Sequence, residues 1–461
     1  MSRDHKRELT RRALIKWSVA AGAALGVSQT RLLEILERHA GRGVAQAAAT
    51  TPTKRSVHIR GVNGGIAWFT LLWPHNAVAA VAGGSTSTWP FAAAQTQKIQ
   101  GTGGALTLGP NTPFANLPAN QQMTAFMAGS NEAHTPNPNS IVRSVNGNSL
   151  FAIVSVLQQA SPTVIPVITV DDAQLGTAPG SPRPAVVPTG EDIVGLFNSA
   201  ASRAGGLLEA ARYAGHADLY RAHYETLAAL NKAANRSTTH DAYATARSAA
   251  QFLGKNLAAE LAITPTDLAA YGIDGNMRPD VAEIGKTLIV TAKAFQLRLT
   301  SSVVLPGLRD DPHDAFTNPT RLNATTAGLK RVLDAFMADL GNRTDTVTGT
   351  KLSDDIVMTF EGDTPKAPLD NTNWLDNTPQ NSNWVYVFGG GKLKTGWFGG
   401  IAPGGQDGIV TGFDPTTGAA TAYDGDTQAK AAVGAVAYAV TRGDIRAVQD
   451  FTRIDISGLI V

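Results

Sequence analysis

Cysteine is absent from the 461 residues of the chain. Its absence excludes disulfides, thiol nucleophiles and zinc sites with cysteine ligands. Charged residues make up only 16% of the chain, and no block of Lys and Arg alternates with aromatic residues, which argues against nucleic acid as a partner. Beyond the first 47 residues every apolar run is short or interrupted, so no stable transmembrane span is expected. Hydrophobic residues still form 43% of the chain, enough for a large buried core.

The first 47 residues carry an excess of positive charge. They hold nine of the 39 Lys and Arg but only four of the 37 Asp and Glu, so the remainder of the chain has a negative net charge. Thr10–Lys16 resembles the twin-arginine export motif, and the uncharged stretch Trp17–Val27 is typical of the apolar part of a signal peptide. Ala45-Gln46-Ala47 then offers a cleavage site of small residues. We expect residues 1–47 to be a signal peptide read by the twin-arginine export machinery, with an uncleaved anchor as the alternative.

The remaining residues, 48–461, are expected to reach the periplasm or the outside of the cell already folded. Their clearest pattern is a strand over 302–305, a helix over 324–340 and a second strand over 356–360. This alternation predicts a βαβ crossover and a mostly parallel sheet. With helices on both faces, the fold class is α/β, a three-layer α/β/α sandwich. A central helical region, 189–300, is predicted within the same domain.

Other apolar, β-branched runs read as further strands. These runs cover 56–59, 67–73, 164–170 and 384–388. The run Phe151–Leu157 has the same composition and is also predicted to be a buried strand.

Acidic and histidine side chains gather in the segments that follow the predicted strands. Ligands of open α/β sheets bind beyond the carboxyl ends of the strands. Carboxylates with a neutral imidazole suit a divalent cation. The candidate metal ligands are Asp311, His313, Glu361, Asp363, Asp376 and, on an earlier loop, His134. The alternative is that Asp, Asn and Pro simply form turns here.

Two further features have a binding interpretation and a plainer alternative. Asn371–Trp374 and Asn381–Trp384 form a near-repeat that could stack on sugars, or else each Trp anchors a strand or loop. The glycine stretches Gly101–Gly104 and Gly389–Gly391 do not match a phosphate-binding loop, and tight turns are expected.

The order of these features resembles a family of exported proteins, the domain of unknown function 1501 family, which is alkaline phosphatase-like and sulfatase-like. Asp311-Pro312-His313 resembles the family's Asp-Thr-His segment, and Phe360–Pro365 stands where Phe-Gly-Arg-Thr is expected. Gly389–Gly396 resembles its glycine-rich strand end, and Ser130–His134 its earlier Ser-His segment.

This resemblance implies an alkaline-phosphatase-like fold and a hydrolase of phosphate or sulfate esters that uses a divalent metal. The sequence departs from the family pattern at three points. Asp376-Asn377 replaces an Asp-His pair, the arginine of Phe-Gly-Arg-Thr is missing, and Gly61–Gly65 lacks an acid. A second hypothesis is therefore a non-catalytic relative that binds a glycan or a partner protein.

Overall fold

The structure is a computed structural model, and it describes seventeen segments of the chain. They are residues 52–61, 97–101, 104–109, 111–114, 123–130, 147–161, 163–197, 218–219, 222–223, 225–226, 252, 255–308, 313, 318–346, 348–361, 382–404 and 409–461. The predicted signal peptide, 1–47, lies outside them.

Two compact units divide the chain. The larger unit comprises Ala49–Ser161, Ile165–Gly190 and Thr264–Val461, and the smaller comprises Met1–Ala48, Pro162–Val164 and Glu191–Ile263. Among the described residues of the smaller unit are the short helices α6 (Ile193–Leu196) and α9 (Leu257–Leu261).

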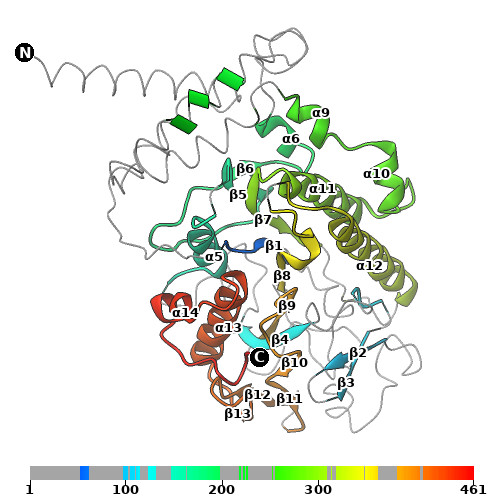
Figure 1. Cartoon of the computed structure of the whole chain (residues 1–461). Helices are drawn as coiled ribbons and strands as arrows, with labels where there is room; N and C mark the ends of the chain where they lie inside the picture. The colour runs from blue at the N-terminus through cyan, green and yellow to red at the C-terminus, as the bar shows by residue number, and fades with distance from the viewer. Residues whose placement is uncertain are drawn as a thin grey trace, which may run out of the picture. The chain divides into compact units, whose positions relative to one another are not determined.

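A mixed, mostly parallel sheet of eight strands forms the centre of the larger unit (Figure 1). Its order is β10-β4-β9-β8-β1-β7-β5-β6. The strands are β1 (Arg55–Arg60), β4 (Thr124–Ser130), β5 (Ile165–Val170), β6 (Ala185–Val187), β7 (Thr300–Pro306), β8 (Ile356–Glu361), β9 (Ser382–Phe388) and β10 (Gly396–Phe398). Only β9 runs against its neighbours, β8 and β4, whereas every other adjacent pair is parallel.

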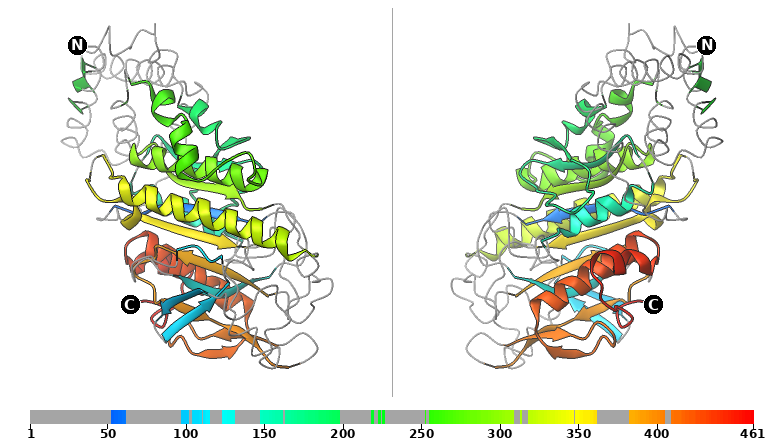
Figure 2. Two further views of the ribbon diagram at one scale, coloured as in Figure 1. Left: turned by 90° about the vertical axis from the view of Figure 1, so that its right-hand side faces the viewer. Right: turned by 90° about the vertical axis from the view of Figure 1, so that its left-hand side faces the viewer.

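Helices lie on opposite sides of this sheet. Figures 1 and 2 place α5 (Leu150–Gln158) and α13 (Gly425–Val440) on one side, and α11 (Pro279–Gln296) and α12 (Pro319–Asn342) on the other. The smaller elements are α10 (Pro265–Ala270), α14 (Ile445–Phe451), the 3-10 turn η3 (Leu352–Asp354), the hairpin β2 (Gln97–Gly101) and β3 (Gly104–Leu108), and a sheet of β11 (Gly400–Ala402), β12 (Ile409–Phe413) and β13 (Ala420–Ala422).

The predicted βαβ unit is confirmed. The strands β7 and β8 are parallel to one another through β1, which lies between them, and α12 connects them. The predicted helix over 324–340 lies within α12, and the apolar side chains that recur at helical spacing form one face that is buried along its length. Those side chains are Leu329, Val332, Leu333, Phe336, Met337 and Leu340.

The predicted strand over 151–157 is wrong, because this run belongs to helix α5. Its residues are apolar on every side, so the sequence has no period that separates a buried strand from a buried helix. A capping residue stabilises the start of the helix. The side chain of Ser149 accepts a hydrogen bond from the backbone N–H of Phe151 (3.2 Å), which satisfies a donor at the helix start. The strands predicted at 56–59, 164–170 and 384–388 are present as β1, β5 and β9, and 67–73 lies outside the described residues.

An ion network surrounds the amino end of β1. The guanidinium of Arg55 pairs with Asp345 and Asp355, and Arg442 pairs with Asp355. A further pair joins Arg298 Nε to Asp345 (2.7 Å). Burial by itself would raise the pKa of Asp345, but the hydrogen bond from Arg298 and the charge of Arg55 hold it well below its ordinary value. We call these five residues the amino-end network.

Candidate functional site

The carboxyl ends of three adjacent parallel strands meet at one edge of the sheet. Strand β1 ends at Arg60, whose register partners are Pro306 at the end of β7 and Glu361 at the end of β8. In open α/β sheets this edge is where ligands bind. On β4, which runs the same way, the last residue is Ser130, paired with Ser382 of β9.

Every predicted metal ligand follows, or stands at, one of these strand ends. His134 comes four residues after the end of β4, Asp311 and His313 come after β7, and Asp363 and Asp376 come between β8 and β9. Of these five, only His313 is among the described residues, and its side chain is exposed. Glu361, the sixth candidate, is described and buried. Within the described part of the chain, no group of three or more His, Asp or Glu is placed to hold a metal ion.

Glu361 faces a guanidinium that is not among the predicted ligands. Its carboxylate Oε1 lies 3.4 Å from Nε of Arg60, and both side chains are buried. Removing two charges from water is costly, and their mutual attraction offsets that cost only while both are present. The carboxylate of Glu361 is therefore balanced by a guanidinium, and a metal ion would have to compete with it. The sequence does contain a sign of this role, because Arg60 is a charged residue that alternates with apolar residues in a central strand.

A buried histidine lies on the same face of β1, two residues farther from the carboxyl edge. His58 precedes Arg60 by two residues, and its Nδ1 is 2.7 Å from the hydroxyl of Thr359, which precedes Glu361 by two. The imidazole is fully buried, and burial lowers the pKa of His58 to about 3. The imidazole is consequently neutral at physiological pH, and it lies two residues before Arg60 on the same face of β1.

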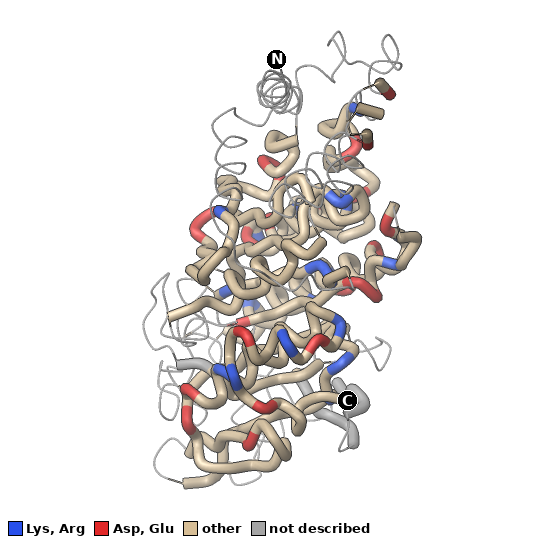
Figure 3. Tube along the Cα trace, turned by 60° about the vertical axis from the view of Figure 1, so that its left-hand side comes forward, with Lys and Arg blue, Asp and Glu red and all other residues tan. Residues whose placement is uncertain are grey.

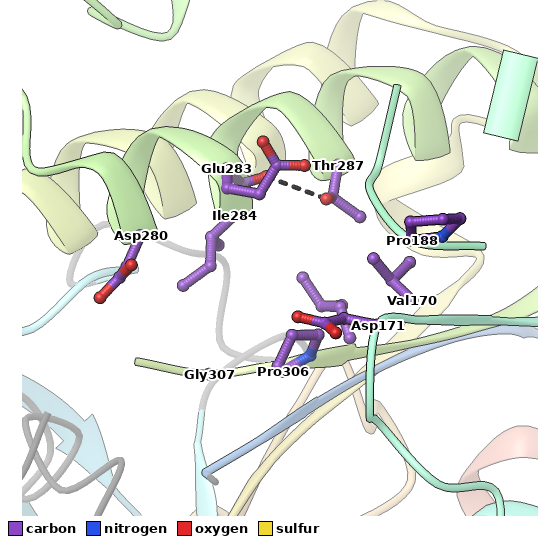
Figure 4. Close-up of a pocket in the computed structure, with 10 residues that line it drawn as sticks. Val170, Asp171, Pro188, Asp280, Glu283, Ile284, Thr287, Pro306 and Gly307 are labelled. Atoms are coloured by element: carbon purple, nitrogen blue, oxygen red, sulfur yellow. Dashed lines mark hydrogen bonds between the residues drawn. The ribbon is translucent and has the colours of Figure 1, made fainter. Parts of the chain in front are cut away.

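A small cavity opens elsewhere on the carboxyl edge, between α11 and the ends of β5 and β7 (Figure 4). Its volume is about 130 Å³. Three carboxylates line it: Asp171 from the end of β5, and Asp280 and Glu283 from α11. Each of the helix carboxylates already has a partner, because Glu283 accepts from the backbone N–H of Gly190 (2.9 Å) and Asp280 pairs with Arg278 (3.1 Å).

The second tryptophan of the Asn/Trp near-repeat is not on the surface. Trp384 is buried in β9, where its ring contacts Trp397 edge-on at 4.9 Å and stacks on Tyr386 at 6.4 Å. This confirms the anchoring alternative for Trp384, and Trp374 lies outside the described residues.

The stretch Gly389–Gly391 is a turn, as expected, and residues 102–103 of the other glycine stretch lie outside the described residues. Gly389 and Gly391 have φ angles of +73° and +60°, which favour glycine, and the carbonyl of Gly389 accepts from Nζ of Lys54 (2.8 Å). Gly101 and Gly104 are register partners in the β2–β3 hairpin.

Basic and acidic residues are interspersed along the described chain (Figure 3). Several form pairs one helical turn apart, such as Lys330–Asp334 and Lys430–Asp426 (both 2.6 Å). In the same described residues, no helix combines the length and the apolar character needed to cross a membrane.

Comparisons with protein families, with curated proteins and with solved structures gave no significant match to the chain.

Proposed function

We propose that this chain is an exported protein with a three-layer, alkaline-phosphatase-like α/β/α fold. Its ligand site lies at the carboxyl edge of β1, β7 and β8, and its reaction is the metal-dependent hydrolysis of phosphate or sulfate esters. The resemblance to the domain of unknown function 1501 family supports the reaction, and the twin-arginine motif supports the export.

The topology of the sheet supports this location of the site. Parallel strands present their carboxyl ends at one edge, so the segments that follow β4, β7 and β8 all start there. These segments contain every candidate ligand except Glu361, which ends β8 itself. A divalent metal there would activate a water molecule and stabilise charge on the ester.

The described residues alone do not make a metal centre, and no catalytic step is assigned to them. His313 is exposed, and Glu361 is held by Arg60. The Arg60–Glu361 pair favours the second candidate function, a non-catalytic protein that binds a glycan or a partner protein at the same edge.

Metal addition distinguishes the two functions. A metal that binds only the folded protein raises its melting temperature. We expect zinc, calcium, magnesium or manganese to do so with the purified mature protein. The double variant Asp311→Asn, His313→Ala should lose this shift, whereas Lys330→Met, at a half-buried position of α12, should retain it.

Hydrolysis is tested on the same samples with p-nitrophenyl phosphate and p-nitrophenyl sulfate. Metal-dependent release of nitrophenol that the double variant lacks would support the hydrolase. Melting curves that no metal moves, together with no hydrolysis, would exclude the hydrolase and favour the binding protein.

A further inference from the structure

His58 is buried at the contact between the sheet and helix α5. Its exposed fraction is 0%, and its ring centroid is 4.8 Å from that of Phe151 on α5. Nδ1 meets the hydroxyl of Thr359, while Nε2 is buried and has no hydrogen-bond partner in the described part of the chain. A neutral imidazole has one N–H and one bare nitrogen, so this arrangement accommodates it at the cost of one unmade hydrogen bond.

A protonated imidazole would be far less well accommodated. Both nitrogens would then carry protons, and the described residues offer the proton on Nε2 no acceptor. A buried charge also needs a partner of opposite charge.

Among the described residues, the elements that surround His58 supply no such partner. Helix α5 contains no charged residue, and Val304 is opposite His58 on β7. The buried residues of α13, which packs on α5, are uncharged as well. The nearest charged groups along β1 and β8 are Arg60 and Glu361, which are paired with one another.

From this geometry we propose that His58 is an acid-sensitive latch that holds helix α5 against β1 and β8. While the imidazole is neutral, α5 stays packed on the sheet. Protonation of the imidazole releases α5 from the sheet. Arg60 and Glu361 stand on the same two strands as His58 and Thr359. Release of α5 therefore also loosens the carboxyl ends of β1 and β8 at the candidate site. This proposal does not depend on the reaction proposed above.

The direction of the pH effect follows from burial. The pKa of His58 is lowered from an ordinary value of 6.5 to about 3 in the folded protein, so the unfolded chain binds this proton first. The contribution of neutral His58 to the free energy of unfolding is therefore fully present above pH 6.5, and it is lost progressively as the pH falls toward 3. Between pH 7.5 and pH 5 the unfolding constant should rise about 30-fold from this one group.

Urea unfolding at several pH values measures this change. His58→Asn keeps a hydrogen-bonding atom near the Nδ1 position but cannot be protonated, so its unfolding constant should lack the 30-fold rise that wild type shows. His313→Asn, an exposed histidine of the same unit, is the matched control and should retain the rise. Equal pH dependence in wild type and His58→Asn would overturn the proposal.

A second measurement uses the wild-type protein and does not require a folded variant. The imidazole nitrogen shifts of His58 in NMR spectra should remain those of a neutral ring at pH 5, and the amides of α5 should exchange faster with solvent than at pH 7.5 after correction for the intrinsic rate. A ring that titrates near pH 6 in the folded protein, or α5 exchange that is unchanged, would contradict the latch.

Discussion

At the scale of single residues, the polar side chains of β1 separate this strand from an ordinary core strand. Ser56, His58 and Arg60 alternate with Val57 and Ile59, and all five are buried. Each polar side chain has its own interaction: Ser56 with Ser302 (3.0 Å), His58 with Thr359 and Arg60 with Glu361. A strand buried on both faces normally consists of apolar residues. The polar face therefore has to be matched, position by position, by neighbouring strands.

The Arg60–Glu361 pair gives a prediction at this scale. Either Arg60→Met or Glu361→Gln should lower the free energy of unfolding by about 3–5 kcal/mol, because each leaves an uncompensated buried charge. The double variant should lose less than the sum of the two, by roughly 0.5–3 kcal/mol. Urea denaturation of the four proteins measures both quantities.

The control for this cycle is the more exposed pair Lys330–Asp334, for which Lys330→Met should cost less than about 1 kcal/mol. Strict additivity of the Arg60 and Glu361 effects would show that the two side chains do not interact.

At the scale of elements, the sequence predicts those whose pattern is local. The helix over 324–340 has a clear period of apolar residues, and the strands on either side of it are β-branched runs bounded by polar loops. Helix α5 lacks a period, and its identity depends on a cap and on the strands that surround it. The reversed direction of β9 also depends on pairing with β8 and β4, which no local pattern encodes.

The local features of the candidate site could also be predicted from the sequence, but its long-range contact could not. The sequence places Glu361 directly after a strand, because the run before it is apolar, and the structure makes it the last residue of that strand. It does not indicate that Arg60 is its partner, because 301 positions separate the two residues and only the sheet order brings them together. Prediction of such a contact requires the strand order, which is a property of the whole sheet.

A second prediction concerns α12. Leu333→Ala or Phe336→Ala should each cost roughly 2–5 kcal/mol, because both side chains are fully buried and truncation leaves a cavity. Ala338→Ser, at an exposed position of the same helix, should change stability by less than about 0.5 kcal/mol. If both buried substitutions lower the free energy of unfolding by less than about 0.5 kcal/mol, the result would be inconsistent with the packing of α12.

At the scale of the whole molecule, the prediction concerns export. Replacing Arg11 and Arg12 by Lys keeps the charge of residues 1–47 but removes the predicted twin-arginine motif. We expect precursor to accumulate in the cytoplasm, as measured by cell fractionation and blotting against the mature protein. A matched substitution of Lys6 and Arg7, outside the motif, should leave export intact. Normal export of the double-Lys protein would refute the assignment of the leader.

The central place of β1 has a consequence for the order in which the chain can fold. A ribosome releases residues 55–60 early, yet the strand's two neighbours, β7 and β8, do not follow until 300–306 and 356–361. The amino-end network likewise waits for Arg442. Such distant pairings cost loop entropy before they form and slow folding. The middle of the sheet therefore closes only after residue 361 has been synthesised, and until then β1 lacks both of its neighbours in the nascent chain.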